Sequence, residues 1–166
     1  QTSPYVGLAR AKAALREAFA AFRHAGVKVE AKGATVNDQN RFEKGLDTQG
    51  GIFGRDHILK MHESAAEGEK GLIVDDLTAW CFGDYYTRTG LDDAQREMIT
   101  LCFLAAQGGC EPQLTSHAAA NMRVGNDRAF LIKVVSQCVP YIGYPRSLNA
   151  LRCIDEAVEA LEADAE

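Results

Sequence analysis

Apolar residues recur at three- and four-residue spacing along most of this chain, and no other feature constrains the fold as strongly. The pattern is clearest over residues 8–23, 73–88 and 93–107. This spacing places apolar side chains on one face of an α-helix, whereas a half-buried β-strand needs strict alternation of apolar and polar residues. No segment alternates convincingly. The sequence therefore predicts an all-α fold.

Helix-breaking residues divide the rest of the chain into shorter segments of the same kind. We expect further helices over residues 37–49, 56–66, 112–124, 127–139 and 146–161. Gly50 and Gly51 are expected to end the first of these, and a turn over residues 140–145 is expected before the last. Residues 25–36 contain two glycines and short β-branched pieces, so we expect a connecting loop there.

Composition and charge exclude several classes of protein. The chain has 166 residues and a net charge of −5, and lysine and arginine form no cluster with interleaved aromatic residues. This argues against nucleic acid or an anionic membrane surface as a partner. No apolar run approaches the roughly 18 residues of a membrane span, and no signal-peptide pattern is present. The five cysteines show no regular framework, which favours reduced thiols and a cytoplasmic location.

A short segment near the N-terminus is repeated near the C-terminus. Residues 4–16 and 140–152 are identical at seven of thirteen positions, beginning with Pro-Tyr-x-Gly in both. Composition alone would give roughly one identity. Two helix starts can resemble each other by chance. The alternative hypothesis is that residues 1–24 correspond to the last helix of a preceding repeat, and that residues 37–166 form the domain itself.

The most chemically suggestive stretch runs from Gly108 to His117. Two glycines and Pro112 place Cys110 at a helix N-terminus, where backbone N–H groups favour a thiolate. His117 follows seven residues later, about two helical turns, so it is expected on the same face as Cys110, with Gln113 between them. The plainer interpretations are that Cys110 is a small residue closing a glycine turn and His117 a core histidine bonded to a carboxylate.

The sequence predicts no metal site and no bound cofactor. His57 and His62 are five residues apart, a spacing that does not bring two ligands to one helical face, and no acidic residues frame them.

Several motifs follow one another along the chain: Phe82-Gly-Asp-Tyr-Tyr-Thr-Arg-x-Gly-Leu91, Arg96-Glu-Met-Ile-Thr100, Gln113-Leu-x-x-His117, Tyr141-x-Gly-x-Pro145 and Leu148-Asn-Ala150. In this order they resemble the carboxymuconolactone decarboxylase family, which belongs to the alkylhydroperoxidase-D-like superfamily. The resemblance extends over about residues 42–159. The resemblance implies an all-α helical bundle that assembles into homotrimers or hexamers, with active sites near subunit boundaries.

Two activity classes within this resemblance differ at one position. Peroxidase-type members are similar to this chain at Glu97, Cys110 and His117, but they carry a second cysteine where this chain has Gln113. The decarboxylases are similar around Asp84, Arg88 and His117, but they carry a glutamate at the position of Gln113. The chain therefore differs from both patterns at the same residue.

The resemblance implies an enzyme that acts on a small carboxylated or lactone metabolite. His117 is expected to carry the proton, with Glu97 orienting it or acting as an acid. The expected substrate-binding residues are Gln113, Arg88, Arg146 and Asp84. For Arg88 and Asp84 a buried ion pair or a helix-end cap is an equal alternative. Two other functions remain open: a thiol-dependent peroxidase or oxidoreductase that uses Cys110, and a non-catalytic oligomeric binding protein.

Overall fold

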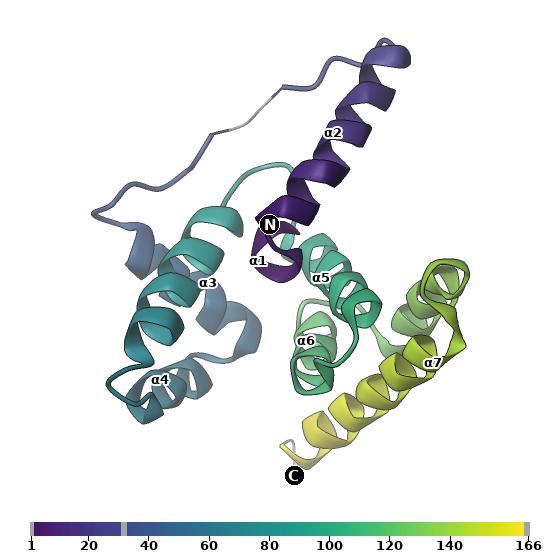
Figure 1. Ribbon diagram of the computed structural model, residues 1–166. Helices are drawn as coiled ribbons and strands as arrows, with labels where there is room; N and C mark the ends of the chain where they lie inside the picture. Colours follow the sequence, from purple (N-terminus) through teal and green to yellow (C-terminus); the bar gives the residue numbers. More distant parts are fainter. Residues whose placement is uncertain (1, 31–32, 165–166) are drawn as a thin grey trace.

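The computed structural model describes residues 2–30 and 33–164. Every element within these residues is a helix, which confirms the all-α prediction (Figure 1). The elements in order are α1 (Thr2–Val6), α2 (Leu8–His24), α3 (Arg41–Phe53), α4 (Arg55–Ser64), η1 (Gly71–Tyr85), α5 (Asp93–Gln107), α6 (Glu111–Arg123) and α7 (Arg128–Ala163). In this part of the chain, no helix has the length and apolar character that a membrane crossing requires.

Helix α5, which carries the centre of the site, begins where the sequence predicts. The Asp92 side chain accepts a hydrogen bond from the Gln95 backbone N–H at 2.8 Å, and the Gln95 side chain accepts one from the Asp92 N–H at 3.1 Å. This reciprocal pair satisfies two backbone donors that a helix start leaves free. Both bonds are local, so the start of α5 can be read from the sequence.

One expected break is wrong and another is confirmed. Helix α3 starts at Arg41 and continues through Gly50 and Gly51 to Phe53. Gly50 is buried there because the backbone of Arg55 packs against it, leaving 3.3 Å to the place where a Cβ would lie. The expected turn over residues 140–145 is confirmed, because α7 consists of two helices that meet at a kink where Gly143 has φ of 75° and ψ of 168°.

Two glycines allow α3 and η1 to pack backbone against backbone. A Cβ on Gly45 would collide with the Thr78 carbonyl, and a Cβ on Gly83 would collide with the Arg41 carbonyl. The segment expected as a helix over residues 73–88 spans Gly71–Tyr85 and is wound as a π-helix. It is therefore helical as expected, but more widely wound than an α-helix.

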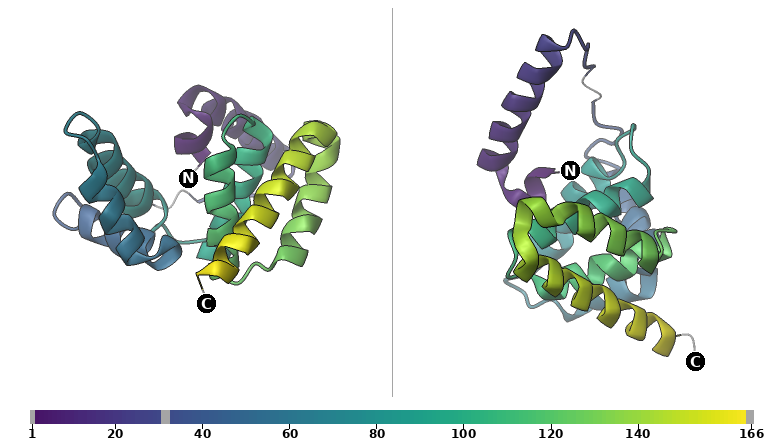
Figure 2. Two further views of the ribbon diagram at one scale, coloured as in Figure 1. Left: turned by 90° about the horizontal axis from the view of Figure 1, so that it is seen from below. Right: turned by 90° about the vertical axis from the view of Figure 1, so that its right-hand side faces the viewer.

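The core has two parts, one on each side of the candidate site. Leu101, Ala118, Leu131 and Ile154 belong to the cluster that joins α5, α6 and α7. The second cluster joins α3 and η1 to α6, and it consists of Ile52, Cys81, Phe82, Tyr86 and Ala120. Figure 2 (left) shows α3, α4 and η1 on one side and α5, α6 and α7 on the other. Tyr5 of α1 packs against both clusters.

Helix α2 stands away from this body (Figures 1 and 2). Among its residues, all of which are described, Ala11 alone is buried. Leu8, Leu15, Phe19 and Phe22 are exposed along it. The N-terminal segment is therefore held to the body mainly through α1, which packs beside α5.

Candidate acid/base site

A buried carboxylate and an imidazole form the centre of the site. Glu97 on α5 is completely buried, and its Oε2 lies 2.6 Å from Nδ1 of His117 on α6. A carboxylate oxygen accepts hydrogen bonds only, so Nδ1–H donates to it, and the ring orientation is set. His117 is 9 % exposed and lines a cavity. Nε2 is the ring nitrogen that remains to exchange a proton with a molecule in that cavity.

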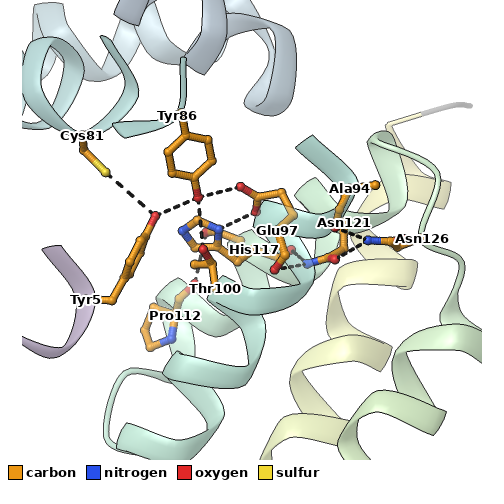
Figure 3. Close-up of polar contacts among 11 residues, drawn as sticks. Tyr5, Cys81, Tyr86, Ala94, Glu97, Thr100, Pro112, His117, Asn121 and Asn126 are labelled. Carbon is orange, nitrogen blue, oxygen red and sulfur yellow. Dashed lines mark hydrogen bonds and ion pairs between the residues drawn. The ribbon is translucent and has the colours of Figure 1, made fainter. Parts of the chain in front are cut away.

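Two tyrosine hydroxyls extend this pair into a chain of hydrogen bonds (Figure 3). Tyr86 donates to Oε1 of Glu97 at 2.9 Å, and its hydroxyl lies 3.0 Å from that of Tyr5. Because the single proton of Tyr86 goes to Glu97, Tyr5 donates to Tyr86. Burial is the main cause that raises the pKa of both phenols well above the usual value. Both hydroxyls therefore stay protonated.

An asparagine bracket holds α5 and α6 in register at this point. Nδ2 of Asn121 donates to the backbone carbonyls of Glu97 at 3.0 Å and of His117 at 2.7 Å. Asn126 in turn donates to Oδ1 of Asn121 at 2.9 Å and to the Ala94 carbonyl at 2.8 Å. Asn121 is fully buried. The bracket ties together the backbone of the two residues that form the acid/base pair.

A cavity of about 340 Å³ opens beside His117 and is mostly apolar. The Phe53 ring meets the imidazole edge-on at 5.1 Å between ring centres, and the Tyr5 ring does so at 5.7 Å. The polar groups that line it are those of Tyr5, Gln49, His57, Gln113, Ser116 and His117. This volume suits a small metabolite.

Of the predicted binding residues, Gln113 is the one that shares this cavity with His117. Arg88 donates from Nε and Nη2 to Oδ1 of Asp84 at 2.8 and 2.7 Å, and it lines a separate open hollow with Tyr85. Arg146 donates to the Ala106 carbonyl at 2.7 Å, at the C-terminal end of α5. In the single chain both arginines therefore have structural partners away from His117.

Cys110 precedes α6 as predicted, and its predicted role as a reactive thiol gains no support from its surroundings. Its side chain lines a small hollow with Arg146, not the His117 cavity, and its thiol donates to the Leu104 carbonyl at 3.4 Å. Burial, followed by the charge of Glu111, raises the pKa of the thiol. These effects outweigh the helix N-terminus, so a thiolate is disfavoured.

Two thiols elsewhere in the described chain lie close together. Sγ of Cys138 lies 3.9 Å from Sγ of Cys102. Cys110 instead neighbours Cys153, whose thiol contacts the Glu111 carbonyl at 3.7 Å.

The two histidines of α4 have separate surroundings. His62 lies 2.9 Å from the Thr78 hydroxyl, while His57 lines the cavity. In the part of the chain that the structure describes, no three side chains of the metal-binding types gather around one point.

Sequence reasoning did not identify Tyr5, Tyr86 or Asn121 as site residues. Tyr86 lies within the first family motif, and Tyr5 lies in the repeated Pro-Tyr-x-Gly. Both tyrosines therefore lie in segments with a recognisable sequence pattern, but the pattern alone does not indicate which hydroxyl contacts Glu97.

Comparisons with known proteins agree with the motifs. The model of the carboxymuconolactone decarboxylase family matches residues 72–156, which include Tyr86, Glu97, Gln113 and His117. The chain is also similar to a 4-carboxymuconolactone decarboxylase of Acinetobacter baylyi, with 25% identity over 126 residues that cover 76% of this chain and 92% of that protein. The match to the family model extends over half of the chain, which therefore belongs to the carboxymuconolactone decarboxylase family.

Proposed function

We propose that this protein is an enzyme that protonates or deprotonates a small carboxylated or lactone metabolite at His117. The observation that supports this most directly is the 2.6 Å contact between Nδ1 of His117 and buried Glu97, beside a cavity of about 340 Å³. A histidine oriented by a carboxylate, with its second nitrogen facing a ligand-sized space, is the arrangement that general acid/base catalysis uses.

Decarboxylation is the reaction that the relationship favours, because the similar Acinetobacter baylyi protein is a decarboxylase by name. Loss of carbon dioxide from a carboxylate leaves an electron pair on carbon, which delocalises into a neighbouring carbonyl as an enolate. That carbon must then take up one proton. We propose that protonated His117 donates it from Nε2, while the negative charge of Glu97 stabilises the imidazolium beforehand.

The cavity defines how the substrate would be held. Gln113 offers an amide N–H to a carboxylate or lactone oxygen, but it cannot transfer a proton at neutral pH. Proton transfer therefore falls to His117. Because Arg88 and Arg146 lie away from the cavity in the single chain, His57 is the other cavity residue whose ring N–H could donate to a substrate carboxylate. The substrate would thus lie between His57 and His117, against the Phe53 ring.

The thiol-peroxidase alternative gains less support. Its attacking thiol would be Cys110, which lies outside the His117 cavity and has a raised pKa. A peroxidatic cysteine needs the opposite shift.

The test is product release from 4-carboxymuconolactone and related carboxylated lactones by the full chain. We expect His117→Asn to lower the rate by roughly 10²- to 10⁴-fold, the usual contribution of a positioned acid/base. Cys110→Ser is the matched control and should retain the parent rate. A His117→Asn variant as fast as the parent would refute the proposal, and consumption of an added peroxide that Cys110→Ser abolishes would favour the peroxidase. A chain that turns over none of these compounds, yet binds them in the cavity, would favour the binding protein.

A further inference from the structure

The repeated Pro-Tyr-x-Gly segment has the same backbone form in both copies. Gly7 has φ 79° and ψ 153°, and Gly143 has φ 75° and ψ 168°. Each glycine interrupts helical backbone just after the tyrosine and is followed by a long helix. Positive φ at this point favours glycine, so the sequence match reflects a shared conformation. Tyr5 and Tyr141 therefore occupy equivalent backbone positions, each two residues before the glycine that interrupts the helix.

The two tyrosines lie in opposite environments. The Tyr5 hydroxyl is 3.0 Å from that of Tyr86, and its ring lies beside Phe103 and His117, at 6.4 and 5.7 Å between ring centres. We call these surroundings, namely Cys81, Tyr86, Phe103 and His117, the tyrosine seat. Tyr141 is 88 % exposed. Tyr141 is therefore an exposed tyrosine on a backbone segment like the one that places Tyr5 in the tyrosine seat.

We propose that Tyr141 inserts into the tyrosine seat of a second copy of this chain and replaces Tyr5 there. The seat selects a phenol, because the hydroxyl of Tyr86 accepts its proton while Phe103 and His117 border its ring. A neighbouring copy then contributes a residue to the His117 site. This inference depends on the geometry of the seat and not on the reaction proposed above.

Exchange is physically reasonable because the N-terminal arm, formed by α1 and α2, contacts the body through α1 and not along α2. In α2, every residue of which is described, Ala11 alone is buried, so the arm rests on the body through α1. Because Tyr5 belongs to the same chain as the seat, its effective concentration there is about millimolar, and Tyr141 of a second copy must compete with it. A second copy can therefore displace it as the protein concentration rises, or when the Tyr5 ring is removed.

The N-terminal segment that carries Tyr5 also indicates which exposed side chain near Tyr141 should not contribute to self-association. Tyr144 stands three residues after Tyr141, at the position that Leu8 holds after Tyr5. Leu8 is 60 % exposed although Tyr5 is seated, so Tyr144 should also stay outside the seat. Each copy gives one tyrosine and receives another, so the contact is head-to-tail and can close into a ring.

The test is the self-association of the full chain, measured by sedimentation velocity from micromolar to millimolar concentration. We expect association that rises with concentration, and Tyr141→Ala should weaken it at least about tenfold, as loss of a central aromatic anchor does. Tyr144→Ala should leave it unchanged. Both side chains are exposed in the single chain, at 88 % and 71 %, so neither change should impair folding.

A variant of the seat tests the exchange directly. Tyr5→Ala, shown by circular dichroism to be folded, should associate at least about tenfold more tightly than the parent. Adding Tyr141→Ala should abolish that gain. A parent chain that stays monomeric at millimolar concentration overturns the proposal. The proposal is also overturned if the Tyr141→Ala and Tyr144→Ala variants associate equally strongly. This comparison tests the proposal even if the Tyr5→Ala variant does not fold. A folded Tyr5→Ala variant that associates no more tightly than the parent also overturns it.

Discussion

Tyr86→Phe removes one hydroxyl from the middle of the hydrogen-bond chain and leaves the ring in place. Tyr86 is 3 % exposed, so the substitution changes little in packing or in contact with water. The lost hydroxyl donates to Oε1 of Glu97 at 2.9 Å, accepts from Tyr5 at 3.0 Å and lies 3.1 Å from the Thr100 hydroxyl. The substitution therefore removes a donor from a buried carboxylate oxygen and the acceptor of the buried Tyr5 phenol, which keeps a 4.0 Å contact with the Cys81 thiol.

The cost can be estimated from the three hydrogen bonds of the Tyr86 hydroxyl. A hydrogen bond to a charged group contributes about 1.5–3 kcal/mol, and one between neutral groups contributes about 1 kcal/mol. With one bond of the first kind and two of the second, we expect Tyr86→Phe to lower the free energy of unfolding by about 3.5–5 kcal/mol. Tyr5→Phe breaks the neutral bond to Tyr86 and the long 4.0 Å contact with the Cys81 thiol, and it should cost about 1 kcal/mol.

The double variant shows whether the hydroxyls act as a chain. Once Tyr86→Phe has removed its acceptor, the buried Tyr5 hydroxyl keeps the long 4.0 Å contact with the Cys81 thiol, so removing this hydroxyl as well should cost about zero. The expected coupling energy is about 1 kcal/mol. Urea denaturation of the parent, the two single variants and the double variant measures it, provided that the slope with denaturant is constant. Additive single effects, within about 0.3 kcal/mol, would refute the chain.

Three further predictions concern a thiol, the alkaline range and a helix contact. Because the pKa of Cys110 is raised, iodoacetamide at neutral pH should modify it more slowly than free cysteine; faster modification, read by peptide mass spectrometry, would contradict the structure. Burial raises the pKa of Cys81 to about 11 from 9.0, so the unfolded chain loses this proton first. The stability that Cys81 contributes is complete below pH 9.0 and lost as the pH rises toward 11, by up to about 1.4 kcal/mol per pH unit. Urea melts from pH 8 to 10.5 should show the decline, and Cys81→Ala should make it shallower. Gly45→Ala should destabilise the fold by about 1–3 kcal/mol, since its methyl group would meet the Thr78 carbonyl. Gly68→Ala has open space, so its thermal melt should stay close to that of the parent.

Local information in the sequence determined most of the helices and part of the site. The bounds of α5 follow from apolar spacing and from the Asp92–Gln95 box, both of which involve residues within a few positions of each other. Gln113 and His117 are four residues apart within α6, and they line the same cavity because a helix returns to one face after that interval. The family motifs include Glu97 and His117, and the structure places these two side chains in contact.

The tertiary structure decided the features that depend on distant residues. Cys110 has φ of −138°, outside α6, so helical spacing does not extend to it and it lies apart from His117. Gly50 stays within α3 because packing against the Arg55 backbone outweighs the low helix propensity of glycine. Tyr5 meets Tyr86 across 81 positions of sequence, a contact that no local pattern specifies. The sequence alone determined which residues are helical and which motifs they carry. The packing of α1, η1, α5 and α6 decided which of their side chains share one buried site, because that depends on burial and on long-range hydrogen bonds.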